Sequence, residues 1–188
     1  MKKQQYLDDC DGCKRSQGKL DPPPMGGIIE LEDDWILNHF GGGGFLGWLV
    51  LQTKFHRMDL AELCSQEIAA FGKNIQLIDK VLRLYWSEIY PDDPIERLYI
   101  IYFFESRFVP SEHEHLHCHL IPRTRKLGKN NKGDYKPWDV AAWKIAELPN
   151  QSYFPDEYRI RDKSGHKINT EKVIALVQYL REHLTSDT

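Results

Sequence analysis

The 188-residue chain lacks the features that would assign a membrane or nucleic-acid role from composition alone. No apolar run approaches the roughly 20 residues that a membrane-spanning helix needs, so we expect no membrane partner. Lys and Arg number 25 against 28 Asp and Glu, and a formal net charge of −3 offers no general field for nucleic acid. The first residues, MKKQQYLDD, have no apolar stretch behind their lysines, which predicts no secretory signal and a cytoplasmic location.

Cysteine is also scarce, with four residues, at positions 10, 13, 64 and 118. In the reducing cytoplasm we expect no structural disulfide among them. The spacing Cys10-x-x-Cys13 is more often a metal or redox site in that setting, although two surface thiols would also satisfy it. A redox pair usually opens a helix, and the polar residues 8–20 do not predict one. Cys64 and Cys118 fall on apolar faces and are expected to pack in the core.

Hydrophobic periodicity predicts an α+β chain. Strands are expected at 28–31, 35–39, 45–52, 97–105 and 114–121. Gly47, inside an apolar run, suggests a bulge or a close backbone approach. Residues 59–87 have helical spacing with Asp59 as the N-cap, and Gly72 leaves a division into two segments open. With a final helix capped by Thr170, the order predicts an antiparallel sheet of about five strands, one long helix and a C-terminal helical extension.

Half of the eight histidines lie in one short segment, at His113, His115, His117 and His119. From residue 116 onward the intervening residues are apolar. Because alternate side chains of a strand share a face, the imidazoles are expected in one row over a buried face. A neutral imidazole is a competent nucleophile near neutral pH, and a neighbouring histidine can protonate a leaving group. The alternatives are a histidine-rich surface strand and an adventitious metal binder.

The run His115-Leu116-His117-Cys118-His119-Leu120-Ile121 resembles the signature of the histidine-triad (HIT) family, His-φ-His-φ-His-φ-φ, in which φ is apolar. Members of this family attack an α-phosphate with the middle histidine and form a nucleotidyl-histidine intermediate. The resemblance therefore implies that His117 is the nucleophile of a catalytic triad with His115 and His119. By the same resemblance, His119 contacts the phosphate and helps to protonate the leaving group.

The resemblance extends upstream, where Gly47, Lys54 and His56 keep their places in the family's strand–turn–helix segment. It implies a HIT-like fold for residues 1–125. The last part of the chain, residues 126–188, does not follow from the family pattern and is expected to be a C-terminal extension packed on the same domain.

A structural zinc site follows from the same resemblance. Many bacterial members, and the related galactose-1-phosphate uridylyltransferases, begin with a Cys-x-x-Cys and complete a zinc site with two histidines. The matching residues here lie in the N-terminal arm 8–27, the third strand's end and the triad: Cys10, Cys13, His56 and His115. Two thiolates and two imidazoles make a closed tetrahedral site. His113, on the same predicted face as His115, is the alternative ligand.

The loop before the triad departs from the family, which usually has Asn-x-Gly…Gly-Gln-Ser/Thr there. Counting back from the triad, Phe104 replaces the Asn, Ser111 the Gln and Glu112 the Ser or Thr. Ser111 can still donate a hydrogen bond to a phosphate. The Glu112 carboxylate would repel the phosphate unless it is paired.

Further substrate-binding candidates lie outside that loop. Arg107 and Arg123 are candidates to offset the Glu112 charge. Asn38 lies nearest to the position at which the family holds the ribose, and His39 is the alternative.

The resemblance implies a HIT-type hydrolase or transferase. It would cleave a phosphoanhydride or phosphoramidate bond in a dinucleoside polyphosphate or a nucleoside-monophosphate conjugate, and it would be a homodimer. A second hypothesis is a nucleotide- or metal-binding module with little catalysis, because the loop before the triad is altered. A third is a nucleotidyltransferase of the uridylyltransferase type, which has Gln where His119 stands.

Overall fold

The computed structural model describes residues 5–41, 45–102, 114–124, 126, 158–160 and 166–184. Its sheet has five antiparallel strands in the order β1-β2-β3-β5-β4. The strands are β1 (Ile28–Glu30), β2 (Trp35–His39), β3 (Leu49–Thr53), β4 (Ile95–Ile101) and β5 (His117–Thr124). The helices are α1 (Asp11–Ser16), α2 (Ser65–Ile89) and α4 (Thr170–Leu184). The predicted α+β architecture, with its five-stranded sheet, long helix and C-terminal helix, is confirmed.

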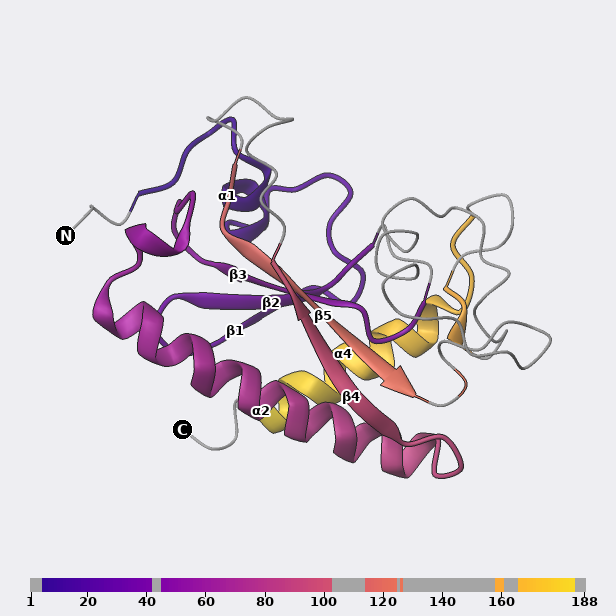
Figure 1. Ribbon diagram of the computed structural model, residues 1–188. Helices are drawn as coiled ribbons and strands as arrows, with labels where there is room; N and C mark the ends of the chain where they lie inside the picture. The colour runs from indigo at the N-terminus through magenta and orange to yellow at the C-terminus, as the bar shows by residue number, and fades with distance from the viewer. Residues whose placement is uncertain are drawn as a thin grey trace.

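The helices occupy two regions of the molecule (Figure 1). The helices α2 and α4 contact each other and the strand β2, and α4 also contacts β1. The short helix α1 lies at the other side, near the beginning of β5. None of the helices in the described segments is long and apolar enough to cross a bilayer.

The strand register gives the sheet two chemically different faces. Cross-strand neighbours on one face belong to the hydrophobic core: Leu37 of β2, Leu51 of β3 and Cys118 of β5. The next row along the same strands lies on the opposite face: Asn38, Val50 and His119. His117 pairs with Gln52 of β3 on that face as well. The expectation that His117 and His119 share one face of a strand, above a buried face, is confirmed.

The strand β3 begins at Leu49, later than the predicted residue 45. At Gly47 the backbone has a φ of +86°, a conformation that only glycine adopts readily. A Cβ added at Gly47 would lie 2.7 Å from the Trp86 ring. The close backbone approach expected at this glycine is confirmed, and its positive φ interrupts the extended backbone ahead of Leu49.

The strand β5 begins at His117, later than the predicted residue 114. The preceding Leu116 donates its backbone N–H to the carbonyl of Arg57 in the loop after β3, at 2.6 Å, so the chain at residues 114–116 follows that loop. The strand then continues to Thr124 through Pro122. The last β3–β5 pair is Leu49 with Leu120, so the missing N–H of Pro122 breaks no bond to β3.

The helix α2 begins at Ser65 and runs through Gly72 without a break. Asp59, predicted as its N-cap, caps a short 3₁₀ turn at Leu60–Glu62 instead. The residue at the N-cap of α2 is Cys64, which is half-buried and therefore does not pack on the apolar face of the helix as expected. The division of the predicted helix thus falls before Ser65 and not at the glycine.

A buried ion pair fixes this start of α2. The Glu67 carboxylate accepts the backbone N–H of Cys64 at 2.7 Å, and Arg57 Nη2 lies 2.9 Å from its other oxygen. Arg57 and Glu67 are 3% and 2% exposed. Arg57 also donates to the carbonyl of His56 at 2.9 Å, so the pair links α2 to the loop after β3.

Replacing Glu67 by Gln is expected to lower the free energy of unfolding by about 3–5 kcal/mol, because it leaves a buried guanidinium without its counter-ion. Chemical denaturation followed by circular dichroism measures the change. The matched control is Asp79→Asn, which removes a partly exposed pair with Arg83 and should cost less than about 1 kcal/mol. Equal losses for the two variants would contradict the importance of the buried pair.

The carboxylate of Asp93, between α2 and β4, joins distant parts of the chain. It is 1% exposed and accepts hydrogen bonds from Thr124 Oγ1 at 2.6 Å, the Tyr158 hydroxyl at 2.7 Å and the Lys126 backbone N–H at 3.1 Å. The predicted C-terminal helix is α4, and Thr170, expected as its N-cap, is its first helical residue. Residues 127–157 of the expected C-terminal extension lie outside the described residues.

Candidate functional site

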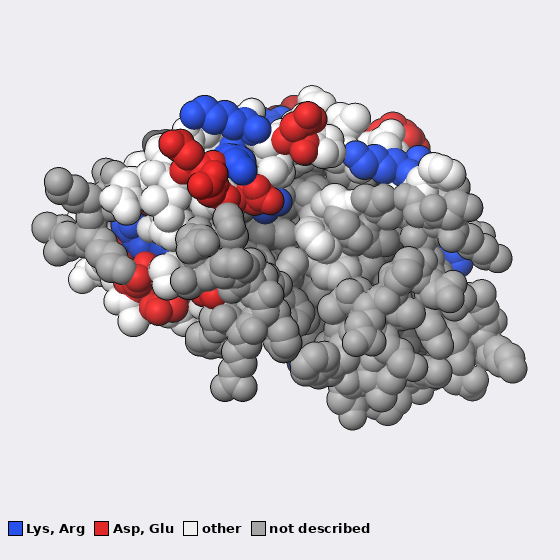
Figure 2. Space-filling model, turned by 90° about the horizontal axis from the view of Figure 1, so that it is seen from above, with Lys and Arg blue, Asp and Glu red and all other residues white. Residues whose placement is uncertain are grey.

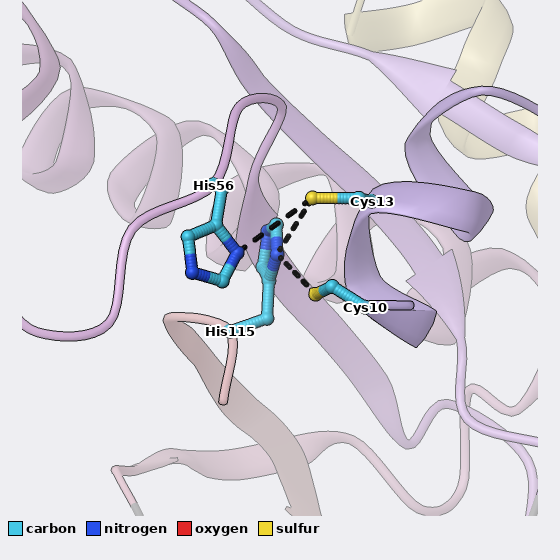
Figure 3. Close-up of side chains that lie close together, drawn as sticks. All are labelled: Cys10, Cys13, His56 and His115. Atoms are coloured by element: carbon cyan, nitrogen blue, oxygen red, sulfur yellow. Dashed lines mark hydrogen bonds between the residues drawn. The ribbon is translucent and has the colours of Figure 1, made fainter. Parts of the chain in front are cut away.

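Four side chains from separate parts of the chain converge beside the start of β5: Cys10, Cys13, His56 and His115 (Figure 3). Their candidate ligand atoms all lie within 4.8 Å of one another. Cys10 Sγ lies 3.3 Å from His115 Nδ1, and Cys13 Sγ lies 3.7 Å from Nδ1 of both His115 and His56. These are the four residues predicted from the sequence, and the structure brings them into one group that could hold a metal ion.

The donor set fits a tetrahedral zinc ion. With Zn–S near 2.3 Å and Zn–N near 2.0 Å, tetrahedral geometry separates neighbouring ligand atoms by about 3.6 Å. His115 Nε2 lies 2.8 Å from the carbonyl oxygen of Thr53, so Nε2 donates a proton there and Nδ1 keeps its lone pair toward the thiols. Burial lowers the pKa of His115 to about 4, which keeps the ring neutral. Burial also raises the pKa of Cys13 to about 11, so a thiolate at that position requires a bound cation.

The Cys-x-x-Cys opens the helix α1, with Cys10 as the N-cap. The expectation that residues 8–20 form no helix is therefore wrong. Tertiary contacts hold this short helix: Gln52 donates its side-chain amide to the carbonyl of Gly12 at 2.9 Å, and Cys13 is fully buried. Because a redox pair usually opens a helix, the position of Cys-x-x-Cys at the start of α1 is compatible with a redox pair. The two imidazoles beside the thiols are further metal-ligand types, and they favour a metal site over a redox pair.

Gly12 allows α1 to approach His115. A Cβ added at Gly12 would lie 2.2 Å from Cγ and 2.6 Å from Nδ1 of the His115 ring, closer than atoms can come. The glycine between the two cysteines is therefore required by the contact between the helix and the imidazole, and not by its own backbone conformation.

Gly12→Ala is expected to displace the His115 ring and to weaken zinc binding by at least about tenfold, because second-shell changes at zinc sites have effects of 10–100-fold. Competition with a chromogenic zinc chelator measures the affinity. The control is Gly72→Ala on α2, where an added Cβ meets nothing within 4 Å. Unchanged zinc affinity in the Gly12 variant would show that α1 can retreat from the imidazole without loss.

His117 is oriented by the backbone of the first triad histidine. Its Nδ1 lies 2.8 Å from the carbonyl oxygen of His115. A carbonyl only accepts, so Nδ1 carries the proton and the neutral ring keeps its lone pair on Nε2. The side chain is half-buried and lies on the face of the sheet opposite the core. An imidazole with this tautomer and this exposure can act as a nucleophile through Nε2.

His119 is held much more deeply, with 6% of its surface exposed. Trp48 Nε1–H donates to His119 Nδ1 at 2.9 Å, which leaves the proton of the neutral ring on Nε2. The ring centre lies 5.1 Å from that of Phe40 and 5.2 Å from that of His117, in both cases edge to face. Burial, together with the charges of His117 and Arg15, lowers the pKa of His119 to about 3.

The predicted substrate-binding residues differ in burial, in hydrogen bonding and in their distance from the triad. Asn38 is 3% exposed and lies in the cross-strand row of His119, and its Nδ2 has no hydrogen-bond partner among the described residues. The alternative, His39, is fully buried and accepts the Gly47 N–H at 3.0 Å. Arg123 lies four residues beyond His119, about 13 Å along the strand, and donates to the Tyr99 hydroxyl at 2.9 Å.

Phe104, Arg107, Ser111, Glu112 and the alternative ligand His113 lie outside the described residues.

Three residues at this face were not predicted. Gln52 bridges α1 and β3, because its amide donates to Gly12 and its oxygen accepts from Arg15 Nη1 at 3.1 Å. Arg15 thereby brings a positive charge to the triad region. Trp48 binds His119. In the sequence, Gln52 could have been noticed as a polar residue at the end of an apolar run. Trp48 could not, because an aromatic residue inside such a run predicts only core packing.

The wider surface around α1 has charges of both signs. Viewed from the end of the molecule at which α1 lies, basic and acidic side chains are interspersed over the described surface, without a broad field of one sign (Figure 2). Among the described residues, Arg15 brings positive charge to the histidines, where it acts on His115 and His119.

No family model and no curated protein sequence matches the chain. Solved structures do resemble it. A HIT-like protein involved in cell-cycle regulation from Bartonella henselae has a TM-score of 0.54 and 15% identity over 95% of this chain and 99% of its own. A hypothetical histidine triad nucleotide-binding protein from Sulfolobus tokodaii has a TM-score of 0.54 and 16% identity over 93% of this chain and 91% of its own. At these identities the likeness establishes a HIT-like fold.

Proposed function

We propose that the chain is a member of the HIT family and a nucleotidyl hydrolase or transferase in which His117 attacks the α-phosphate of a nucleotide. One observation carries this proposal: the His117 Nδ1–H bond to the carbonyl of His115, at 2.8 Å. It directs the lone pair of a half-buried imidazole away from the backbone. The HIT-like fold, the sequence signature and the neighbouring His119 support the same role.

The reaction divides into two displacements. His117 Nε2 forms a bond to phosphorus while the bond from phosphorus to the leaving group breaks, and the electron pair departs with that group. Water or another acceptor then attacks phosphorus, and the N–P bond breaks to regenerate the imidazole. In this reaction Arg15, whose charge acts on His119, would offset the negative charge of the phosphate, and His119 would supply a hydrogen-bond donor at Nε2.

We propose a structural zinc ion held by Cys10, Cys13, His56 and His115. With all four positions filled by protein ligands, the ion would leave no site for substrate, and its contribution would be to fix the fold. The side chain of His115 would bind the ion while its carbonyl orients His117. The metal would thereby hold the nucleophile's hydrogen-bond acceptor in place without touching the substrate.

We also propose a homodimer. The strand β4 lies at the edge of the five-stranded sheet that the structure describes, and its Ile100 is 50% exposed. An exposed apolar side chain on an edge strand favours pairing with another chain. Sedimentation equilibrium of the purified protein measures the mass in solution.

The function is tested by incubating the purified protein with adenosine and guanosine polyphosphates and nucleoside-monophosphate conjugates. Products are separated by chromatography. Release of a nucleoside monophosphate supports the hydrolase, and its transfer to an added acceptor supports the transferase. Tight binding without any product would contradict the enzyme and favour the nucleotide-binding module.

A further inference from the structure

The indole of Trp48 is locked against His119. Trp48 is 4% exposed, and its ring centre lies 4.9 Å from Phe40 and 5.3 Å from Phe45. Its carbonyl accepts the backbone N–H of Phe40 at 2.7 Å, which fixes the chain on which the indole stands. The bond from Nε1 to His119 Nδ1, at 2.9 Å, is therefore made by a donor that has no room to rotate away.

This contact restricts the protonation of His119. An imidazolium ion has two N–H donors and no acceptor, whereas the indole nitrogen is only a donor. A second proton on His119 would sit on Nδ1, break the bond to Trp48 and leave two donors facing each other in a buried space. The groups that face or influence this ring from its surroundings, His117 and Arg15, bear or can bear positive charge and oppose the second proton as well.

We propose that Trp48 fixes His119 as a neutral hydrogen-bond donor that cannot serve as a general acid, and that the enzyme therefore selects phosphoanhydrides over phosphoramidates. This inference rests on the proposed function and narrows its substrate class. It also changes the role expected for His119 from the family resemblance, because the residue then binds phosphate without protonating the leaving group. Trp48 acts through His119 and is a positioning residue.

The chemistry of the two leaving groups explains the selectivity. When His117 Nε2 displaces a nucleoside polyphosphate, the P–O bond breaks and the electron pair leaves on a phosphate oxygen, which is stable as an anion at neutral pH. When it displaces an amine, the P–N bond breaks and the electron pair stays on nitrogen, which must receive a proton during the step. Neutral His119 is too weak an acid to give that proton, and the imidazolium form that could give it would have to break the bond to Trp48.

The first test compares diadenosine tetraphosphate with adenosine 5′-phosphoramidate as substrates of the whole protein. General acids contribute about 10²–10⁴-fold, so kcat/KM for the anhydride is expected to exceed that for the phosphoramidate by at least about 100-fold. Trp48→Phe removes the donor and should reduce this ratio at least about tenfold. The matched control is Trp86→Phe, a fully buried tryptophan of α2 whose ring stacks on that of Tyr158. It should leave the ratio unchanged.

The second test reads the tautomer directly, by ¹⁵N–¹H correlation spectra of the histidine rings. His119 is expected to be neutral with its proton on Nε2 down to pH 5 in the wild type, and Trp48→Phe should allow it to titrate in that range. A charged His119 in the wild type, or equal cleavage of both substrates, would overturn the inference. If neither substrate is cleaved, the proposed function fails and the substrate selectivity fails with it, while the spectra still decide the role of Trp48.

Discussion

The His117→Asn variant is expected to lose nucleotidyl transfer by a factor on the order of 10⁴–10⁶, the range seen when a catalytic nucleophile is removed. An asparagine amide can still donate to the carbonyl of His115, but it has no lone pair that attacks phosphorus. Because His117 is half-buried and outside the core, the free energy of unfolding should change by less than about 1 kcal/mol. Steady-state product formation and acid-quenched capture of labelled protein measure both effects.

The matched control is His183→Asn on α4. His183 is exposed, and its Nδ1 also bonds to a backbone carbonyl, that of Tyr179, at 2.8 Å. The two variants therefore lose the same type of side chain with the same type of hydrogen bond. Full activity in the His117 variant, or equal loss in both, would contradict the assignment of the nucleophile.

Removal of the proposed zinc ion is expected to be the largest perturbation of stability. Structural zinc contributes about 10–16 kcal/mol in small peptides. If about 5 kcal/mol of that amount stabilises this larger fold, the melting temperature falls by about 10–20 °C. The group ties together α1, the loop that carries His56 and the chain before β5, so these parts should separate first.

Metal analysis and differential scanning calorimetry before and after treatment with a strong chelator measure this effect. Cys13→Ser should reproduce the loss, whereas Cys64→Ser should retain about one zinc ion per chain, because Cys64 lies outside the group. Turnover should fall in parallel with zinc content, since the backbone of His115 orients His117. A metal-free protein with unchanged melting and turnover would refute the structural site.

The features that could be predicted from the sequence depend on short local patterns of residues. The alternation of His117 and His119 with apolar residues predicted a strand with two different faces, and the register confirms it. The four cysteine and histidine positions came from a family pattern, and the fold brings them together. In both cases the residue types themselves indicate the chemistry, because thiols and imidazoles have few other reasons to cluster.

The parts that could not be predicted depend on contacts between distant segments. Nothing in residues 8–20 indicates that Gln52 will hold them as a helix against β3. The start of α2 depends on the pairing of Glu67 with Arg57, which local helix signals around Asp59 do not contain. Trp48 has the pattern of a core residue, and only its partner in space reveals a polar role.

The Asp93 carboxylate has a consequence for how the chain tolerates change in length. It binds both the backbone of Lys126 and the hydroxyl of Tyr158, so the two ends of the intervening stretch are anchored at one buried group. The entropic cost of lengthening a connection between two fixed ends grows only logarithmically, by about 0.6 kcal/mol for each doubling of its length. Insertion of a fluorescent reporter or an affinity tag between these two anchors should therefore leave the sheet and the histidine face intact.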